Sequence, residues 1–204
     1  MTSTLLLIRH AACDHVGRRL AGRAPGVHLN QEGRRQADAL AVALAALPVE
    51  AVYSGPLERA RETAAALGRH LELPVGVASG LDELDYGDWT GRSLDALSDD
   101  PVWQAYNARR SSTRIPGGES MGEVVARGAA ELERIRRAHP DGMVVAVSHG
   151  DVIRGLLLHA LGAPLDRIHR LEVAPASVSV LQLFEDVWQV VTVGWMAGGP
   201  IRPG

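Results

Sequence analysis

The amino-acid sequence predicts an α/β fold, a three-layer α/β/α sandwich with a central, mostly parallel sheet and an antiparallel edge strand. Apolar segments of strand length alternate along the chain with segments whose apolar residues recur every three or four positions, as in proteins built from β-α-β units. With 204 residues, of which 46% are hydrophobic and 22% charged, the chain can form one substantial core. It contains no repeat, low-complexity tract or linker, so we expect a single domain over residues 1–204.

The first predicted strand is the short apolar run over residues 4–8. A loop rich in Gly and Arg follows over residues 11–29. Asn30 is suited to cap a helix over residues 31–47, in which Ala and Leu recur at i, i+3 and i+4 spacing, and Pro48 ends that helix. These segments form the first β-α unit.

A second unit follows the same pattern. Residues 51–53 predict a short strand, and Pro56 is suited to the first position of a helix that extends to about residue 70. Residues 75–78 predict a third strand.

The segment at about residues 93–118 departs from this alternation. It is polar, irregular and partly helical, and we interpret it as an insertion or lid rather than as part of the core. Ser120 and Glu123 then fit a capping box and begin a helix that ends near residue 139.

The last part of the chain completes the predicted sheet. An apolar strand over residues 143–147 precedes a helix over about residues 151–161. Two further strands, 177–183 and 187–193, are predicted to form an antiparallel hairpin at the sheet edge. The apolar residues from Val187 to Trp195 either complete the sheet or cover a homodimer interface, and the pattern alone does not separate these alternatives.

Composition excludes several classes of protein. All 21 basic residues counted as Lys or Arg are arginine, which excludes Schiff-base and pyridoxal-phosphate enzymes and the lysine-dependent P-loop. A net charge of −3 argues against a nucleic-acid partner. A single cysteine, Cys13, excludes a disulfide framework and suits a reducing compartment, and no segment approaches the ~20 apolar residues of a membrane span. We therefore expect a cytoplasmic protein with no membrane partner.

Chemically informative residues follow three of the predicted strands and accompany a fourth. In open α/β sheets the functional site lies at the carboxyl ends of the strands. Arg9 and His10 follow the first strand, Arg59 lies one turn after the second, and His149 follows the strand at 143–147. The acidic run that includes Glu83 lies near the third strand. Two histidines, two arginines and a carboxylate are thus expected at one edge of the sheet.

This set suits phosphoryl transfer. A neutral imidazole can attack phosphorus and carry the phosphoryl group, and arginine forks match phosphate oxygens while supplying fixed positive charge. A carboxyl group with a raised pKa can protonate the leaving oxygen. The chemistry needs no metal ion, and the eight histidines show no metal-ligand spacing.

Several motifs together resemble the histidine phosphatase superfamily, in its phosphoglycerate-mutase-like, cofactor-independent phosphatase branch. In chain order these motifs are Ile8-Arg9-His10-Ala11, Ser54-Gly-Pro-Leu-Glu-Arg59-Ala60-Arg-Glu-Thr63-Ala64, Leu81-Asp-Glu83-Leu-Asp-Tyr-Gly87-Asp-Trp89-Thr-Gly91, Gly117-Gly-Glu-Ser120 and Val147-Ser-His149-Gly150. Each motif alone is weakly specific, but the ordered set is highly specific and covers residues 4 to about 194.

The resemblance implies a role for each matched position. His10 would be the phosphorylated nucleophile and Glu83 the proton donor, while Arg9, Arg59 and His149 would bind the phosphoryl group. The predicted substrate-binding set also contains Gly150, through its amide, and Gly22. The family needs neither a metal nor an organic cofactor.

Two departures from the family pattern concern phosphate binding. Ala11 stands where the family usually has glycine, and Cys13 and Val16 stand where it often has Thr or Ser and then Asn. A side-chain ligand of the phosphate is therefore missing at these positions. Nearby arginines could compensate, and the sequence leaves three candidates open: Arg18, Arg19 and Arg23.

Other charged residues have alternative interpretations. Asp82, Asp85 and Asp88 lie close enough to Glu83 to compete for the role of acid, although Glu83 matches the motif best. Glu119 and Ser120 are interpreted as a helix start, and His15 and His28 as rim residues, with contact to the substrate as the alternative for the two histidines. The predicted lid contains three arginines, Arg109, Arg110 and Arg114. Packing and solvated charge is the favoured interpretation of these residues, and contact to the substrate is the alternative.

The predicted function is hydrolysis of a phosphomonoester, a small phosphorylated metabolite, through a covalent phosphohistidine on His10, as in histidine acid phosphatase-type enzymes. The first alternative is a phosphoglycerate mutase, which would return the phosphoryl group to its substrate. The second is a catalytically weak phosphate-binding module. Retention of both histidines and both arginines favours an enzyme, and the absence of lysine in the lid favours a hydrolase.

Overall fold

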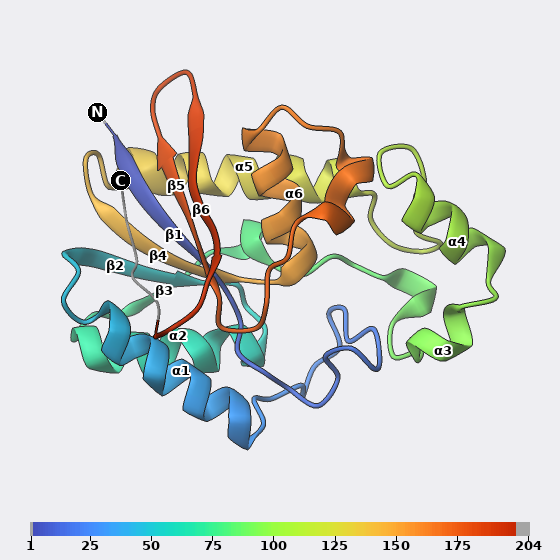
Figure 1. The fold of residues 1–204 in the computed structure, drawn as a ribbon, viewed down its shortest axis with the longest axis horizontal. Coiled ribbons are helices and arrows are strands. Elements are labelled where there is room, and N and C mark those ends of the chain that lie inside the picture. Colours follow the sequence, from blue (N-terminus) through green and yellow to red (C-terminus); the bar gives the residue numbers. More distant parts are fainter. Residues whose placement is uncertain (1, 199–204) are drawn as a thin grey trace.

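The computed structural model describes residues 2–198. Within these residues a six-stranded sheet has the order β3-β2-β4-β1-β5-β6, with helices on both faces (Figure 1). β5 runs antiparallel to β1, and β6 antiparallel to β5, whereas the other pairs are parallel. The strands are β1 (Ser3–Arg9), β2 (Val49–Ser54), β3 (Val75–Val77), β4 (Met143–Ser148), β5 (Val178–Leu183) and β6 (Trp188–Trp195). The predicted three-layer α/β/α fold, with its mostly parallel sheet and antiparallel edge, is confirmed.

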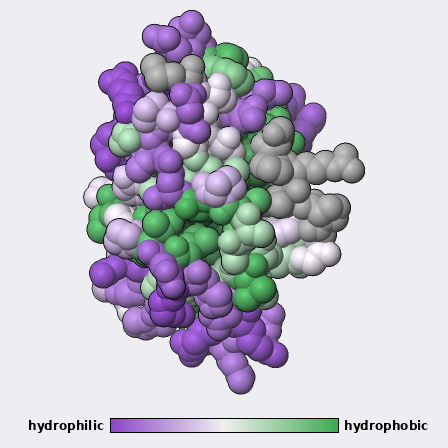
Figure 2. Space-filling model, turned by 90° about the vertical axis from the view of Figure 1, so that its left-hand side faces the viewer, coloured by the Kyte–Doolittle hydropathy of each residue, from purple (hydrophilic) through white to green (hydrophobic). Residues whose placement is uncertain are grey.

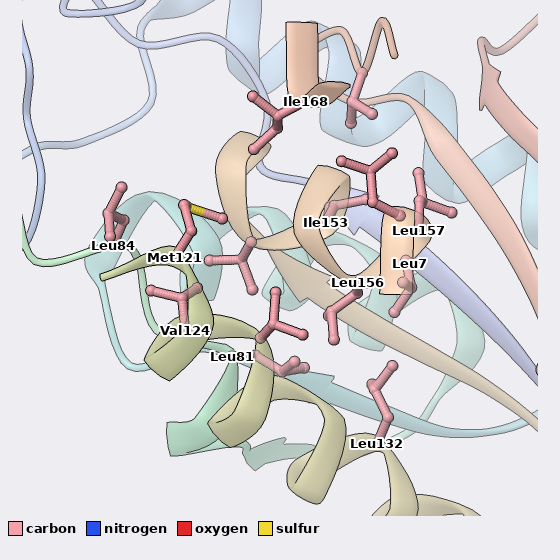
Figure 3. Close-up of a cluster of buried hydrophobic side chains, with 14 of the residues drawn as sticks. Leu7, Leu81, Leu84, Met121, Val124, Leu132, Ile153, Leu156, Leu157 and Ile168 are labelled. Carbon is pink, nitrogen blue, oxygen red and sulfur yellow. The ribbon is translucent and has the colours of Figure 1, made fainter. Parts of the chain in front are cut away.

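Helices α1 (Gln31–Leu44) and α2 (Glu58–Leu71) cover one face of the sheet, and α5 (Met121–Ala138) and α6 (Gly150–Ala160) cover the other (Figure 1). Because side chains alternate across a strand, β1 contributes to both cores. Leu6 packs with α1 and α2, and Leu7 packs with α5 and α6. Figure 3 shows Leu7 close to Leu156 and Leu157 of α6. The sheet is therefore buried between two apolar layers.

Two helix ends differ from the prediction. Asn30 caps α1 by accepting a hydrogen bond from the amide of Gly33 at 2.8 Å, as its residue type predicts. The helix ends at Leu44 rather than at 47, because Pro48 has no N–H to donate to the Leu44 carbonyl, and the chain turns instead through the hydrogen bonds of Ala45 to Val42 and of Leu47 to Leu44. Helix α2 begins at Glu58 rather than at Pro56, since Gly55 before it still donates its amide hydrogen to β4, to the carbonyl of Val147.

The prediction that residues 93–118 lie outside the core is wrong. This segment contains α3 (Leu94–Leu97) and α4 (Pro101–Ala108), and Leu97 and Tyr106 are fully buried. Tyr106 and Trp103 pack against the buried Trp89, with ring centroids 5.5 Å and 5.2 Å from that of Trp89. Aromatic rings bury large apolar surfaces, so a segment that is polar on average still contributes side chains to the core on the α5 and α6 face of the sheet.

Short 3-10 helices complete the connections: η1 (Ser79–Leu81), η2 (Gly87–Trp89) and η3 (Leu165–Arg170). At the sheet edge, the apolar residues of 188–195 form β6, which corresponds to the first of the two alternatives for this segment. Figure 2 shows the molecule from the side at which the parallel strands begin, where hydrophobic side chains gather at the centre of a largely hydrophilic face. The polar groups described next lie at the opposite ends of these strands.

Candidate active site

The carboxyl ends of β1, β2 and β4 bring the predicted site residues together. Arg9 is the last residue of β1 and His10 follows it, while Arg59 lies in the first turn of α2. His149 caps α6 directly after β4, and Gly150 is the first residue of that helix. The imidazole rings of His10 and His149 lie with their centroids 5.2 Å apart, so β1 and β4 bring two histidines that are 139 residues apart in sequence into one site.

His10 is buried and fixed in one orientation. Its Nδ1 lies 2.8 Å from the carbonyl oxygen of Ala11, and its Nε2 accepts from Nε of Arg59 at 3.3 Å. Since a carbonyl can only accept, Nδ1 carries the hydrogen and Nε2 carries the lone pair. Burial, reinforced by the charge of Arg59, lowers the pKa of His10 to about 3, so the ring is neutral around pH 7. A neutral imidazole with its lone pair on Nε2 is a nucleophile.

Both arginines are anchored through part of their guanidinium group only. Nη1 of Arg9 donates to the carbonyl of Val173 at 2.7 Å, and Nη2 of Arg59 donates to the carbonyl of Gly22 at 2.8 Å. In contrast, Arg9 Nε, Arg59 Nη1 and both ring nitrogens of His149 are buried and have no hydrogen-bond partner among the described residues. Buried polar groups are normally paired, so unpaired donors gathered around His10 indicate a site for an anion.

The two predicted glycines allow close approach in this region. A Cβ at Gly150 would lie 3.2 Å from Arg9 Nε, so a side chain there would press on the arginine. Gly22 has φ of +50°, which favours glycine, and its carbonyl orients Arg59. Gly22 also lines the cavity that opens beside His10.

Glu83 faces the same site. One of its carboxylate oxygens, Oε2, lies 3.7 Å from His149 Nδ1 and 4.0 Å from Arg59 Nη2, while Oε1 accepts from the amide of Leu84 at 2.9 Å. Burial raises the pKa of Glu83 to about 7, against the opposing effect of the Arg59 charge. A carboxyl group with this pKa is partly protonated at neutral pH and can both donate and accept a proton.

The neighbouring acids have other contacts. Asp82 accepts from the amide of Glu83 at 2.8 Å and lies 3.3 Å from Arg23, and Asp85 accepts from the amide of Gly87 at 2.9 Å. Asp88 is exposed. Of these four carboxylates, only Glu83 lines the cavity that opens beside His10.

That cavity has a volume of about 280 Å³, and Arg9, His10, Arg59, Glu83 and Gly150 form one part of its wall. The remaining polar or aromatic lining residues are Cys13, His15, Arg19, Tyr86, Trp103, Asn107, Arg110, Asp151, Arg154 and His169.

The departures from the family pattern have distinct structural settings. The methyl group of Ala11 is buried in the apolar core with α1 and α2, so the extra carbon is accommodated. Cys13 and Val16 line the cavity without offering a hydroxyl or amide group to it. Of the three arginines considered as compensation, only Arg19 lines the cavity. Arg23 instead donates to the carbonyl of Glu83 at 2.8 Å.

A buried ion pair that the sequence analysis missed forms another wall of the cavity. Asp151 accepts from Arg110 Nη1 at 2.8 Å, from the hydroxyl of Tyr86 at 2.7 Å and from Arg154 Nη1 at 3.2 Å. Burial alone would raise the pKa of Asp151, but Arg110 and these hydrogen bonds hold it well below its usual range. The interpretation of Arg110 as a solvated charge is wrong, because its side chain is only 3% exposed. In the sequence, Asp151 stands three residues before Arg154 in the same helix, which is the pattern of an exposed i, i+3 pair and gives no signal of the buried one.

The other singled-out residues lie outside this wall or at its margin. Arg109 and Arg114 are exposed, and Arg114 pairs with Glu123 at 2.8 Å. His15 lines the cavity, whereas His28 is exposed and pairs with Glu62. Within residues 2–198, no helix combines the length and apolarity needed to cross a membrane. In the same part of the chain no three or more His, Cys, Asp or Glu side chains are grouped so as to hold a metal ion.

Comparison with known proteins identifies the family. The sequence model of the histidine phosphatase superfamily (branch 1) matches residues 5–196. The chain is 37% identical over 186 residues to the "Bifunctional protein Rv2228c" of Mycobacterium tuberculosis, covering 89% of this chain but 50% of that protein, so it spans about half the length of this relative. It is 34% identical to the glucosyl-3-phosphoglycerate phosphatase of the same organism, covering 79% of this chain and 76% of that one.

Solved structures agree with this result. The native structure of mycobacterial glucosyl-3-phosphoglycerate phosphatase superimposes with a TM-score of 0.85 and 28% identity, covering 97% of this chain and 100% of that one. The matched region contains every residue of the site described above. The chain belongs to the histidine phosphatase superfamily, branch 1.

Proposed function

We propose that this protein is a phosphomonoester hydrolase that acts through a covalent phosphohistidine on His10. The observation that carries the proposal is the state of that ring. His10 is neutral, its lone pair is on Nε2, and unpaired donors of Arg9 and Arg59 surround it. The relatives named as phosphatases support hydrolysis as the outcome.

In the first step, the lone pair of His10 Nε2 attacks phosphorus and the ester P–O bond breaks. The leaving oxygen takes the proton of Glu83, whose pKa of about 7 lets it hold that proton near neutrality. The N–H groups of Arg9 and Arg59 stabilise the charge on the transferring oxygens, and His149 donates one further hydrogen bond. The hydrogen bond from Nδ1 to the Ala11 carbonyl keeps the ring in the required tautomer.

In the second step, water attacks the phosphorus atom of phosphohistidine. The Glu83 carboxylate accepts the proton of that water as the N–P bond breaks. Inorganic phosphate leaves, and His10 returns to its neutral form. All the groups used belong to the chain itself, so we propose that neither a metal nor an organic cofactor takes part.

The proposed substrate is a small phosphorylated metabolite whose leaving group is anionic. Beyond the phosphoryl end, the cavity is lined by Arg19, Arg154, His15 and His169, and the one carboxylate there, Asp151, is already paired. Nε of Arg154 donates to the carbonyl of Leu171 at 3.0 Å and Nη1 donates to Asp151 at 3.2 Å, which leaves Nη2 for an anionic group of the substrate. The substrate that gives the related glucosyl-3-phosphoglycerate phosphatase its name carries a carboxylate beside its phosphate, which agrees with this proposal.

The test is turnover of an aryl phosphate by the wild type and by His10→Ala, followed by incubation with 3-phosphoglycerate. Release of inorganic phosphate that disappears in His10→Ala is the expected result. Migration of phosphate between substrate hydroxyls without release would instead assign a mutase. Phosphate binding without turnover would assign a binding module.

A further inference from the structure

The loop that carries Glu83 is held against helix α5 by one arginine. Arg127 Nη1 donates to the carbonyls of Gly80 and Asp82 at 2.8 and 2.7 Å, and Nη2 donates to the carbonyl of Glu83 at 3.0 Å. The loop also lies directly on the helix, since a Cβ at Gly80 would come within 2.5 Å of Glu131 Cβ and 2.7 Å of the Arg127 carbonyl.

Glu119 holds this arginine in place. Arg127 Nε donates to Glu119 Oε1 at 3.0 Å, and Nη2 donates to Oε2 at 3.0 Å. Together with the three carbonyls, these contacts use all five N–H donors of the guanidinium group. An ammonium group has three donors and no fork, so lysine cannot reproduce the arrangement.

Glu119 connects further parts of the same loop. Its Oε2 also accepts from the amide of Asp85 at 3.1 Å and from Arg23 Nη2 at 2.9 Å. Arg23 in turn donates to the carbonyl of Glu83 at 2.8 Å, so two arginines share that carbonyl. None of these contacts involves the Glu83 carboxylate, whose Oε2 remains directed at His149 and Arg59.

We propose that Arg127 and Glu119 are positioning residues for the proton donor, fixing the backbone from Gly80 to Asp85 so that the Glu83 carboxyl stays buried beside the leaving oxygen. The inference rests on the proposed role of Glu83. Without the clamp that Arg127 and Glu119 form, the loop backbone loses the three carbonyl contacts of Arg127. The Glu83 carboxyl group then moves away from its position and becomes hydrated. Protonation of the leaving group then weakens, while attack by His10 is retained.

The test compares kcat/KM for an activated aryl phosphate and an alkyl phosphate, because kcat/KM reports the steps through phosphoryl transfer and only the alkyl leaving group needs a proton. Arg127→Met is expected to lower kcat/KM for the alkyl substrate about tenfold or more, and for the aryl substrate less than about threefold. The fall in activity at high pH is expected to shift to lower pH, since a hydrated carboxyl group holds its proton less strongly. Arg127→Lys is expected to give an intermediate loss.

The matched control is Arg137→Met. Arg137 is an exposed arginine of the same helix that pairs with Glu133, and its replacement should leave the ratio of the two kcat/KM values unchanged. Equal losses on both substrates, with no change in the pH profile, would show a structural role only and overturn the inference. If Arg127→Met does not fold, Glu119→Gln provides the same test at constant side-chain size.

Glu83→Gln separates the two proposals. If Glu83→Gln lowers kcat/KM more for the alkyl than for the aryl phosphate, and Arg127→Met and Glu119→Gln do not, the inference alone fails. If Glu83→Gln lowers kcat/KM equally for both substrates, the proposed role of Glu83 fails, and the inference fails with it.

Discussion

Replacing Glu83 by Gln is expected to stabilise the folded protein at alkaline pH while it removes the proton donor. Burial raises the pKa of Glu83 from 4.5 to about 7 in the folded state. A raised pKa means that the folded state prefers the neutral acid, so the carboxylate costs stability once the pH exceeds the unfolded pKa, and the cost levels off above the folded pKa. At about 1.4 kcal/mol for each pH unit, the full cost is about 3 kcal/mol, of which about 2.5 kcal/mol develops between pH 5 and pH 8.5.

The assay is urea unfolding of the wild type and of Glu83→Gln at both pH values. Subtracting the two differences in unfolding free energy cancels any effect of the amide that does not depend on pH. The advantage of the variant over the wild type is expected to grow by about 2.5 kcal/mol from pH 5 to pH 8.5. The control is Asp88→Asn, measured in the same way, because it removes one negative charge from an exposed position nearby in the chain. A difference that is the same at both pH values would refute the claim that burial raises the pKa of Glu83.

Three further predictions concern the cavity wall and the chemistry. Arg110→Met leaves the buried carboxylate of Asp151 without its main partner and is expected to lower the unfolding free energy by about 3 kcal/mol. The exposed Arg114→Met is expected to lower it little, and equal losses in urea unfolding would contradict the buried-pair interpretation. Arg154→Met is expected to raise KM for a phosphorylated hydroxy acid about tenfold and to change KM for an aryl phosphate little, and a uniform change would exclude a role in recognising an anionic leaving group. EDTA is expected to leave turnover unchanged, whereas a loss that an added metal ion restores would overturn the proposed reaction.

The sequence predicted the sheet and the convergence of the site because both follow from local signals. Apolar runs of strand length predicted every strand, and the rule that sites lie at the carboxyl ends of parallel strands placed His10 and His149 together. The ends of α1 and α2 were missed by two or three residues. The cause is the turns around Pro48 and Gly55, whose backbone depends on the strand that each adjoins.

Contacts between distant segments could not be predicted in this way. The polar composition of residues 93–118 gave no sign of the buried Tyr106 and the partly buried Trp103, which pack against Trp89 from outside the segment. Arg110 and Asp151 are 41 residues apart, and each alone has the pattern of an exposed charge. Arg23 was considered as a phosphate ligand because it is near in sequence, yet its partners are the carbonyl of Glu83 and the carboxylate of Glu119.

The position of the phosphoryl group on the enzyme tests the central proposal most directly. The phosphoenzyme would be trapped by rapid quenching into base, in which phosphohistidine survives, and examined by phosphorus NMR and peptide mass spectrometry. Because Nδ1 of His10 is hydrogen-bonded to the Ala11 carbonyl, the expected species is phosphohistidine on Nε2 of His10, absent in His10→Ala and retained in a His149→Ala variant that still reacts. A phosphoryl group on Nδ1, on His149 or on no histidine during active turnover would contradict the proposed mechanism.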